Sequence, residues 1–302
     1  MIKKLKVSIS QENLRIDKWL KINFSTLTQN FIEKNLRKKN IVVNGKVASS
    51  KYRLIANDEI KIFNFNTETY KHYKKIKKEF KVPQNFIKLF NSSIIHNDTN
   101  FLVINKWSGI STQGGSKINI SIDHIIKNIS DSYNLVHRLD KETSGMLIIA
   151  KNLEYTKLFG RMFKNNEIEK IYFAFCQGKP KIPESIVDLQ ISLDGKKEKN
   201  VKTITYYKLL NYKNGISQML FVPKTGKKHQ LRIVSKNIGC PIIGDRKYNT
   251  HNRFSKENLK LNASIIKFTI KSKKYEFKSI LPTDFLDFIQ KNKLKKIKKL
   301  EI

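Results

Sequence analysis

Residues 135–151 constrain the fold of this chain more than any other part of the sequence. A short apolar run enters this stretch, a polar loop rich in turn-forming residues follows, and a second apolar run at 146–150 leaves it. The pattern predicts strand, loop and strand, with Asp140 at the centre of the loop. An isolated Asp in a loop usually only caps the turn, because Asp, Thr and Ser hydrogen-bond nearby backbone groups. Motifs elsewhere in the chain favour a carboxylate held at a strand end to meet a ligand.

The charge of the chain indicates its partner. Sixty Lys and Arg residues against 25 Asp and Glu give a formal charge of +35, so the compact chain repels itself unless it binds a polyanion. Nucleic acid is the expected partner. Only eight of the sixty are Arg, and Ile and Asn are abundant, so part of the lysine excess is attributable to genomic codon bias. Arg138 and Arg232 lie within the segments richest in motif residues, where a planar guanidinium can form two hydrogen bonds to a phosphate or carboxylate.

Length and apolar content predict a folded protein of one large or two modest domains. The chain has 302 residues, 39% of them hydrophobic, which is enough to bury a real core. No apolar stretch approaches the ~20 residues of a membrane span, and the N-terminus lacks a secretory signal, so we expect a cytosolic protein. Cys176 and Cys240 have no metal-ligand spacing and are too few for a disulfide framework, which predicts buried, reduced thiols and no metal.

Residues 1–66 are expected to form a small helical and β domain. Apolar residues at helical spacing predict one helix from about Arg15 and a second from about Thr28. Asn40 is expected to end the second helix in the left-handed conformation. A hairpin with an Asn-Gly turn at 41–47 and a strand at 59–63 complete the prediction.

The exposed faces of this first domain are basic and suit an RNA backbone. We expect contacts from Lys18, Arg37 and Lys38. Residues 67–88 follow, where hydrophobic periodicity fades and charged and aromatic residues dominate, which predicts a basic linker.

Residues 89–302 are expected to form an α+β domain around a mixed, mostly antiparallel sheet. The expected elements are a hairpin at 94–106, helices at 122–129 and 153–164, and strands at 169–176, 203–208 and 218–221. A glycine turn at Gly226 then delivers His229, Gln230 and Arg232 onto a helix start, a geometry for gripping an anion or a base edge. The lysine-rich segment 291–299 is interpreted as a solvated, amphipathic helix end.

Two resemblances connect these motifs. Residues 15–17, the two predicted helices and Val43-Asn44-Gly45 resemble the S4 RNA-binding domain over about fifty residues. Nearly the whole chain resembles the RluA family of RNA pseudouridine synthases, above all members that modify large-subunit ribosomal RNA and carry an N-terminal S4 domain. The matching segments, in the right order, are 96–98 through 114–115, 137–145, 170–172 and 226–232. Trp107 and Val234 depart from the family pattern, which usually has Pro and His there.

The resemblance implies isomerisation of uridine to pseudouridine without a cofactor. Asp140 is then the nucleophile, attacking either the ribose C1′ or the base C6, and Arg232 is its paired cation, expected to lower its pKa. Tyr172 is the tyrosine that stacks on the target base and assists proton removal from C5. Arg138 holds the duplex open after the target nucleotide has flipped out. The other residues expected to contact RNA are His137, Leu139, Thr143, Lys170, His229, Gln230 and Leu231.

The expected partner is large-subunit (23S) ribosomal RNA, including its pre-ribosomal particles, bound by a monomer. The modified uridines, and whether transfer RNA is also a substrate, do not follow from the sequence. The main alternative is a non-catalytic S4-type RNA chaperone or ribosome-assembly protein with a degenerate second domain. A nucleoside hydrolase or glycosidase that uses Asp140 and Glu142 is a second alternative, although neighbouring loop carboxylates lack the opposed spacing of such enzymes.

Overall fold

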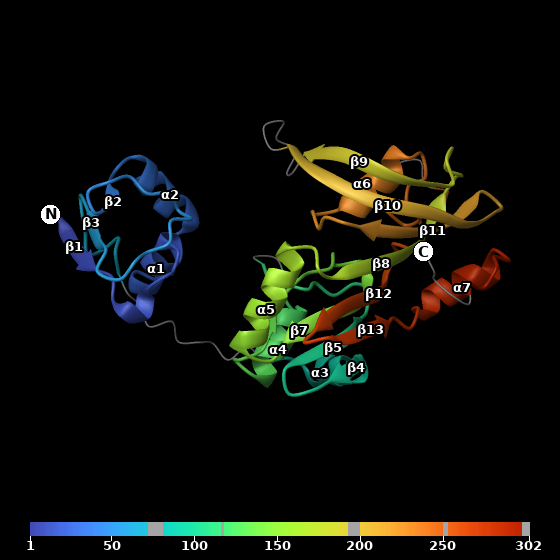
Figure 1. Cartoon of the computed structure of the whole chain (residues 1–302), viewed down its shortest axis with the longest axis horizontal. Helices are drawn as coiled ribbons and strands as arrows, with labels where there is room; N and C mark the ends of the chain where they lie inside the picture. Colours follow the sequence, from blue (N-terminus) through green and yellow to red (C-terminus); the bar gives the residue numbers. More distant parts are fainter. Residues whose placement is uncertain (72–80, 116–117, 193–199, 250–252, 298–302) are drawn as a thin grey trace. The chain divides into compact units, whose positions relative to one another are not determined.

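The computed structural model describes residues 1–71, 81–115, 118–192, 200–249 and 253–297. The chain divides into two compact units, Met1–Glu79 and Phe80–Ile302. The first unit contains helices α1 (Ile16–Asn23) and α2 (Gln29–Arg37) and a three-stranded antiparallel sheet (Figure 1). The sheet has the order β1-β3-β2, with bounds Lys3–Lys6, Glu59–Ile62 and Ile41–Val43.

The helices of the first unit form where the apolar spacing predicts them. Trp19 and Leu20 of α1 and Ile32 and Leu36 of α2 lie in one buried core. Thr28 caps α2, since its hydroxyl accepts the Phe31 N–H at 3.2 Å. Both helices therefore bury one face and leave the other to solvent.

Two details of this unit differ from expectation. The left-handed residue after α2 is Lys39 (φ 62°), whereas Asn40 donates its side-chain amide to Asn35. The Asn44-Gly45 turn forms with both residues left-handed, but the chain returns only as far as a bridge from Val43 to Lys46. The ladder partner of β2 is instead the later strand β3, so packing rather than the turn decides the pairing.

The expected linker at 67–88 is wrong at both ends. Tyr70 is buried in the first core against the rings of Phe24, Phe31 and Phe65. Helix α3 (Gln84–Ser92) begins inside the expected linker, and its Phe90 is buried in the second unit. Residues 72–80 of the expected linker lie outside the described residues.

In the second unit, the described strands form one ten-stranded sheet. Its path is β4-β5-β7-β12-β8-β11-β10-β9, with β13 on β12 and β6 on β7 (Figure 1). The bounds are Ile94–Asn97 (β4), Phe101–Lys106 (β5), Asn134–Leu135 (β6), Ser144–Ala150 (β7), Glu169–Gln177 (β8), Glu184–Ser192 (β9), Asn200–Lys213 (β10), Ile216–Pro223 (β11), Leu261–Ile270 (β12) and Lys273–Lys278 (β13). Among the strands that the structure describes, only the β7–β12 ladder is parallel, which confirms the expected mixed, mostly antiparallel sheet.

Helices cover both faces of the centre of this sheet. Residues 144–150 of β7 are all buried, as a continuous apolar run predicts for a strand covered on two sides. Leu147 and Ile149 pack with the apolar face of α4 (Ile122–Ile129), and Met146 and Ile148 pack with that of α5 (Leu153–Lys164). The second unit also contains α6 (Gln230–Asn237) and α7 (Thr283–Lys291).

The parallel contact between β7 and β12 requires a glycine. Gly145 pairs with Ala263 at φ 111°, and a Cβ at Gly145 would lie 2.3 Å from the Ala263 carbonyl oxygen. Next to it, the buried Asn262 amide donates to the Ser144 hydroxyl at 2.8 Å. This close approach fixes the strand that begins directly after the Asp140 loop.

The C-terminal segment differs from its interpretation as a solvated helix end. Helix α7 already ends at Lys291, and Leu294 and Ile297 pack against the core of the second unit. The Gln218 amide donates to the Lys295 carbonyl at 2.9 Å. Residues 298–302 lie outside the described residues. No helix in the described ranges is long and apolar enough to cross a membrane.

Candidate active site

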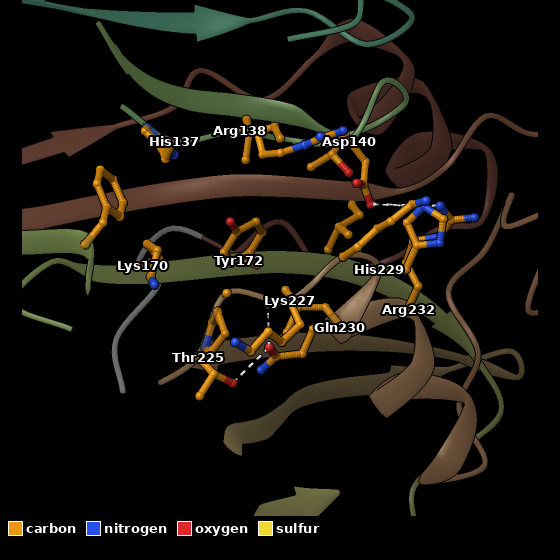
Figure 2. A pocket seen from close by; sticks show the side chains of 18 of the residues that line it. His137, Arg138, Asp140, Lys170, Tyr172, Thr225, Lys227, His229, Gln230 and Arg232 are labelled. Atoms are coloured by element: carbon orange, nitrogen blue, oxygen red, sulfur yellow. Dashed lines mark hydrogen bonds and ion pairs between the residues drawn. The ribbon is translucent and has the colours of Figure 1, made fainter. Parts of the chain in front are cut away.

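A cavity of about 540 Å³ opens where two parts of the sheet meet at β12. We call β4, β5, β7 and the loop 138–143 the carboxylate half, and β8 to β11 with α6 the cation half. Asp140 comes from the first half, and Tyr172 on β8 and Arg232 on α6 come from the second (Figure 2). The other expected residues that line the cavity are His137, Arg138, Leu139, Thr143, Lys170, His229, Gln230 and Leu231.

Backbone contacts hold the Asp140 loop. The buried Thr112 hydroxyl donates to the Leu139 carbonyl at 2.7 Å and accepts the Leu139 N–H at 3.1 Å. The Thr143 N–H donates to the Asp140 carbonyl at 3.1 Å, which closes the turn. Leu139 is buried in the core, so the neighbouring Asp140 is directed toward the cavity, where its side chain is 22% exposed.

Lys106 supports the same loop from beneath. The residue is 1% exposed, and its ammonium donates to the carbonyls of Trp107, Ile110 and Lys141 at 2.9, 3.0 and 3.2 Å. Burial lowers the pKa of Lys106 to about 7, against the opposing charges of Glu142 and Asp140. One buried lysine side chain thus joins the glycine-spaced loop after β5 to the residue that follows Asp140.

Arg232 is held by a second carboxylate. Asp245, whose side chain is fully buried, accepts hydrogen bonds from Arg232 Nε and Nη2, both at 2.7 Å. Burial would lower the pKa of Arg232, but Asp245 and then Asp140 raise it above the usual value. Arg232 Nη1 lies 3.9 Å from Asp140 Oδ2, so the guanidinium is fixed by one carboxylate and presented to another.

His229 lies on the same side of Asp140. Its Nε2 is 3.9 Å from Asp140 Oδ2, and its Nδ1 hydrogen-bonds the Tyr248 hydroxyl at 3.0 Å. The residue is left-handed (φ 57°) where the chain enters α6. Burial lowers the pKa of His229, Asp140 opposes the shift, and Arg232 and nearby lysines add to it. Figure 2 shows the Asp140 carboxylate pointing toward both His229 and Arg232.

Tyr172 and His137 supply uncharged walls. Burial and the negative charge of Asp140 raise the pKa of Tyr172 well above its usual value, so the phenol keeps its proton at neutral pH. Burial, with a smaller effect of Lys170, lowers the pKa of His137 to about 3. The His137 Nε2 accepts the Ile148 N–H at 2.8 Å, and the ring stacks on Phe163 with centroids 4.4 Å apart.

Gln230 and Leu231 shape the cavity from within the protein. Gln230 is 3% exposed and its amide bonds Thr225, Lys227, Ile204 and Thr205, so its polar atoms already have protein partners. Leu231 is 6% exposed and lies in the core. Gln230 therefore fixes the loop 225–230, whereas Arg138 is exposed and available to a ligand.

Lys18, Arg37 and Lys38 lie elsewhere. They belong to the first unit, where Lys18 is exposed on α1, Arg37 at the end of α2 and Lys38 directly after it. Glu142, the partner that a hydrolase would use, is exposed and is not among the lining residues either.

Sequence reasoning missed Lys106, Thr112, Asp245 and Tyr248. Lys106 reads as an ordinary strand-end lysine, and only the tertiary structure shows that it is buried. Asp245 carries a weak signal, because it follows Gly244 in a dense Gly-Asp-Arg-Lys-Tyr segment. The two family departures have local explanations: Val234 is a buried residue of α6, and Trp107 packs against the core beside α4.

The fold and sequence match known proteins. The model of a family described as RNA pseudouridylate synthase matches residues 100–237. The chain is 40% identical to "Ribosomal large subunit pseudouridine synthase C" of Rickettsia bellii, covering 78% of this chain and 82% of that one. The protein of the same name from Buchnera aphidicola subsp. Baizongia pistaciae is 30% identical over 97% of this chain and 96% of its own.

Structural similarity agrees. "Human RNA Pseudouridylate Synthase Domain Containing 4" aligns with a TM-score of 0.60 at 23% identity, covering 70% of this chain and 97% of that one. The fold and the family match therefore define a pseudouridine synthase catalytic domain. The chain belongs to the RluA family of RNA pseudouridine synthases, which are isomerases.

Proposed function

We propose that this enzyme isomerises specific uridines of large-subunit (23S) ribosomal RNA and that Asp140 is its nucleophile. The observation that carries the proposal is that Asp140, Tyr172 and Arg232 come from different elements and line one cavity. The names of the Rickettsia and Buchnera relatives support the choice of RNA. The proposal includes a monomer that acts in the cytosol, on free RNA or on pre-ribosomal particles.

The reaction makes and breaks one glycosidic bond and leaves the composition of the nucleotide unchanged. The N1–C1′ bond of uridine breaks, the base rotates while held, and a C5–C1′ bond forms; C5 loses a proton and N1 gains one. The Asp140 carboxylate either attacks C1′ and is displaced by C5, or adds to C6 and is eliminated after the C5–C1′ bond has formed. Two cationic or hydrogen-bonding groups, Arg232 and His229, lie 3.9 Å from that carboxylate and orient it.

The surroundings of Asp140 suit a flipped base. Tyr172 offers a ring on which the base stacks, and its hydroxyl is assigned to assist proton removal from C5. Arg138 is exposed at the cavity and is assigned to the space that the extruded nucleotide leaves. Flipping costs a few kcal/mol, which stacking and the basic surface offset.

The first unit is proposed to be an S4-type RNA-binding domain. Its Asp17 carboxylate accepts from Arg15 at 3.1 Å and from Gln29 at 3.0 Å, which joins the helix that carries Lys18 to the helix that ends at Arg37, directly before Lys38. A Lys18→Gln/Lys38→Gln double variant should bind ribosomal RNA several-fold more weakly. The matched control is Lys4→Gln/Lys6→Gln, which removes two exposed charges from β1. Equal affinities of the two variants would remove the assignment.

The decisive experiment maps pseudouridine in ribosomal RNA from cells that lack this protein and are complemented with variants. Asp140→Asn should abolish the modification that the wild type restores, while RNA binding persists. The matched control is Glu142→Gln, which removes an exposed carboxylate two residues away and should remain active. An Asp140→Asn variant that still forms pseudouridine would refute the nucleophile, and release of free uracil by the wild type would revive a hydrolase.

A further inference from the structure

A second cavity adjoins the active site. It has a volume of about 860 Å³ and is bordered by the end of β9, by α6 and by residues 247–248. Lys228 and His229 line both cavities, so the second begins where the first ends. In Figure 1, β9 and α6 lie next to each other in the part of the sheet that carries the cation half.

The lining of this second cavity is cationic at the surface and apolar beneath. Lys228, Lys236 and Lys247 are exposed, whereas Ile191 is buried and Ile233 is half-buried. Among the described residues that line it, none is Asp or Glu. Lysines of this kind suit phosphates, and the apolar surface between them suits ribose or base.

The position of the second cavity indicates which phosphates of a bound RNA can reach its lysines. The Tyr248 hydroxyl holds His229, and His229 faces Asp140, so one short chain of contacts joins the second cavity to the proposed nucleophile. A nucleotide strand whose target base enters the first cavity has to leave it along a neighbouring surface. The surface containing Lys228 is continuous with it and carries positive charge.

We propose that this second cavity binds the sugar-phosphate backbone of the nucleotides that flank the target uridine, with Lys236 and Lys247 contacting phosphates. The inference rests on the proposed function and specifies where the same RNA runs beyond the active site. The proposed ligand is the phosphodiester backbone of RNA. The alternative is that the same lysines bind a free phosphate or a mononucleotide.

The first test compares Lys236→Gln/Lys247→Gln with a control, Lys213→Gln/Lys274→Gln, which removes two exposed lysines that line neither cavity. On a ribosomal RNA fragment that the wild type modifies, the first variant should raise KM more than it lowers kcat. The slope of log affinity against log salt concentration should be shallower by about 1.4 in this variant, because each lost phosphate contact to single-stranded RNA lowers the slope by ~0.7. The control should match the wild type.

The second test neutralises the RNA instead of the protein. Methylphosphonate linkages beside the target uridine should weaken binding of the wild type and have little further effect on Lys236→Gln/Lys247→Gln, because both changes remove the same contact. Fully additive effects, or a variant that behaves like the control, would overturn the proposal. The proposal would also fail if inorganic phosphate bound the wild type through Lys236 and Lys247 while the wild type and the Lys236→Gln/Lys247→Gln variant had the same affinity for RNA.

These experiments distinguish failure of the proposed function from failure of the flanking-strand site. If the wild type forms no pseudouridine in the fragment or in whole ribosomal RNA, the proposed function fails. If the wild type is active and the lysine variant is unaffected, only the flanking-strand site fails. Thermal unfolding of both variants checks that the exposed substitutions leave the fold intact.

Discussion

The two halves of the catalytic sheet hold their functional groups by different means. In the carboxylate half, Thr112 and Lys106 contact backbone atoms, so Asp140 is placed by the path of its loop. In the cation half, Asp245 and Tyr248 contact side chains directly, so Arg232 and His229 are placed by their own polar groups. Under the proposed mechanism, a loop held through its backbone leaves the Asp140 carboxylate available to react. Groups that only orient this carboxylate can keep permanent partners of their own.

The largest effect is expected in the cation half. Asp245→Ala leaves a buried guanidinium without its bidentate partner, which should destabilise the protein by about 3–5 kcal/mol. In the fraction of this variant that folds, displacement of Arg232 from Asp140 should lower kcat about 10²-fold. Chemical denaturation and single-turnover assays measure the two effects. Asp188→Ala, which breaks an exposed pair with Lys202, is the control and should cost less than about 1 kcal/mol.

The next effect tests the backbone support of the carboxylate half. Lys106→Met removes the donor from three carbonyls and should cost about 2–3 kcal/mol, with a fall in kcat and little change in KM. Lys127→Met is the matched control, since Lys127 also donates to Asp131, Tyr133 and Asn134 but is exposed. Similar losses in both variants would mean that burial of the lysine is unimportant.

A smaller effect is expected from one hydroxyl. Thr112→Val removes both hydrogen bonds to Leu139 in a buried site and should cost about 1–2 kcal/mol, whereas Thr112→Ser keeps the hydroxyl and should lose less. Denaturation midpoints and kcat measure the difference. If Ser and Val were equivalent, the hydroxyl would not be what fixes the loop.

The smallest effect is a pH dependence. His137 has a pKa of about 3 in the folded protein and about 6.5 unfolded, so the unfolded chain binds the extra proton between these values. Stability from this group is therefore complete above pH 6.5 and is lost as the pH falls, by about 1 kcal/mol between pH 6 and pH 5. His137→Gln should show a shallower decline in urea unfolding over that interval. Parallel curves for the two proteins would contradict the assignment.

Local patterns predicted the parts of the site that lie within one motif. The loop around Asp140, the strand with Tyr172 and the helix start with Arg232 each carry a contiguous signal, and the helices at 122–129 and 153–164 have the expected bounds. Helix α7 was missed although Pro282 precedes it and Phe285, Phe288 and Ile289 have helical spacing. Lys106, Asp245 and strand β12 could not be assigned, because their partners lie far away in the sequence and only the folded sheet brings them together.

The central place of β12 has a consequence for synthesis of the enzyme. This strand is inserted between β7 and β8, although it follows them by about a hundred residues. A ribosome-bound nascent chain that ends before Leu261 contains Asp140, Tyr172 and Arg232 but lacks the strand that connects their two halves. Catalytic competence should therefore appear late in translation, and long-range pairing of this kind predicts slow final folding. A nascent chain that lacks β12 is therefore expected to be inactive on RNA.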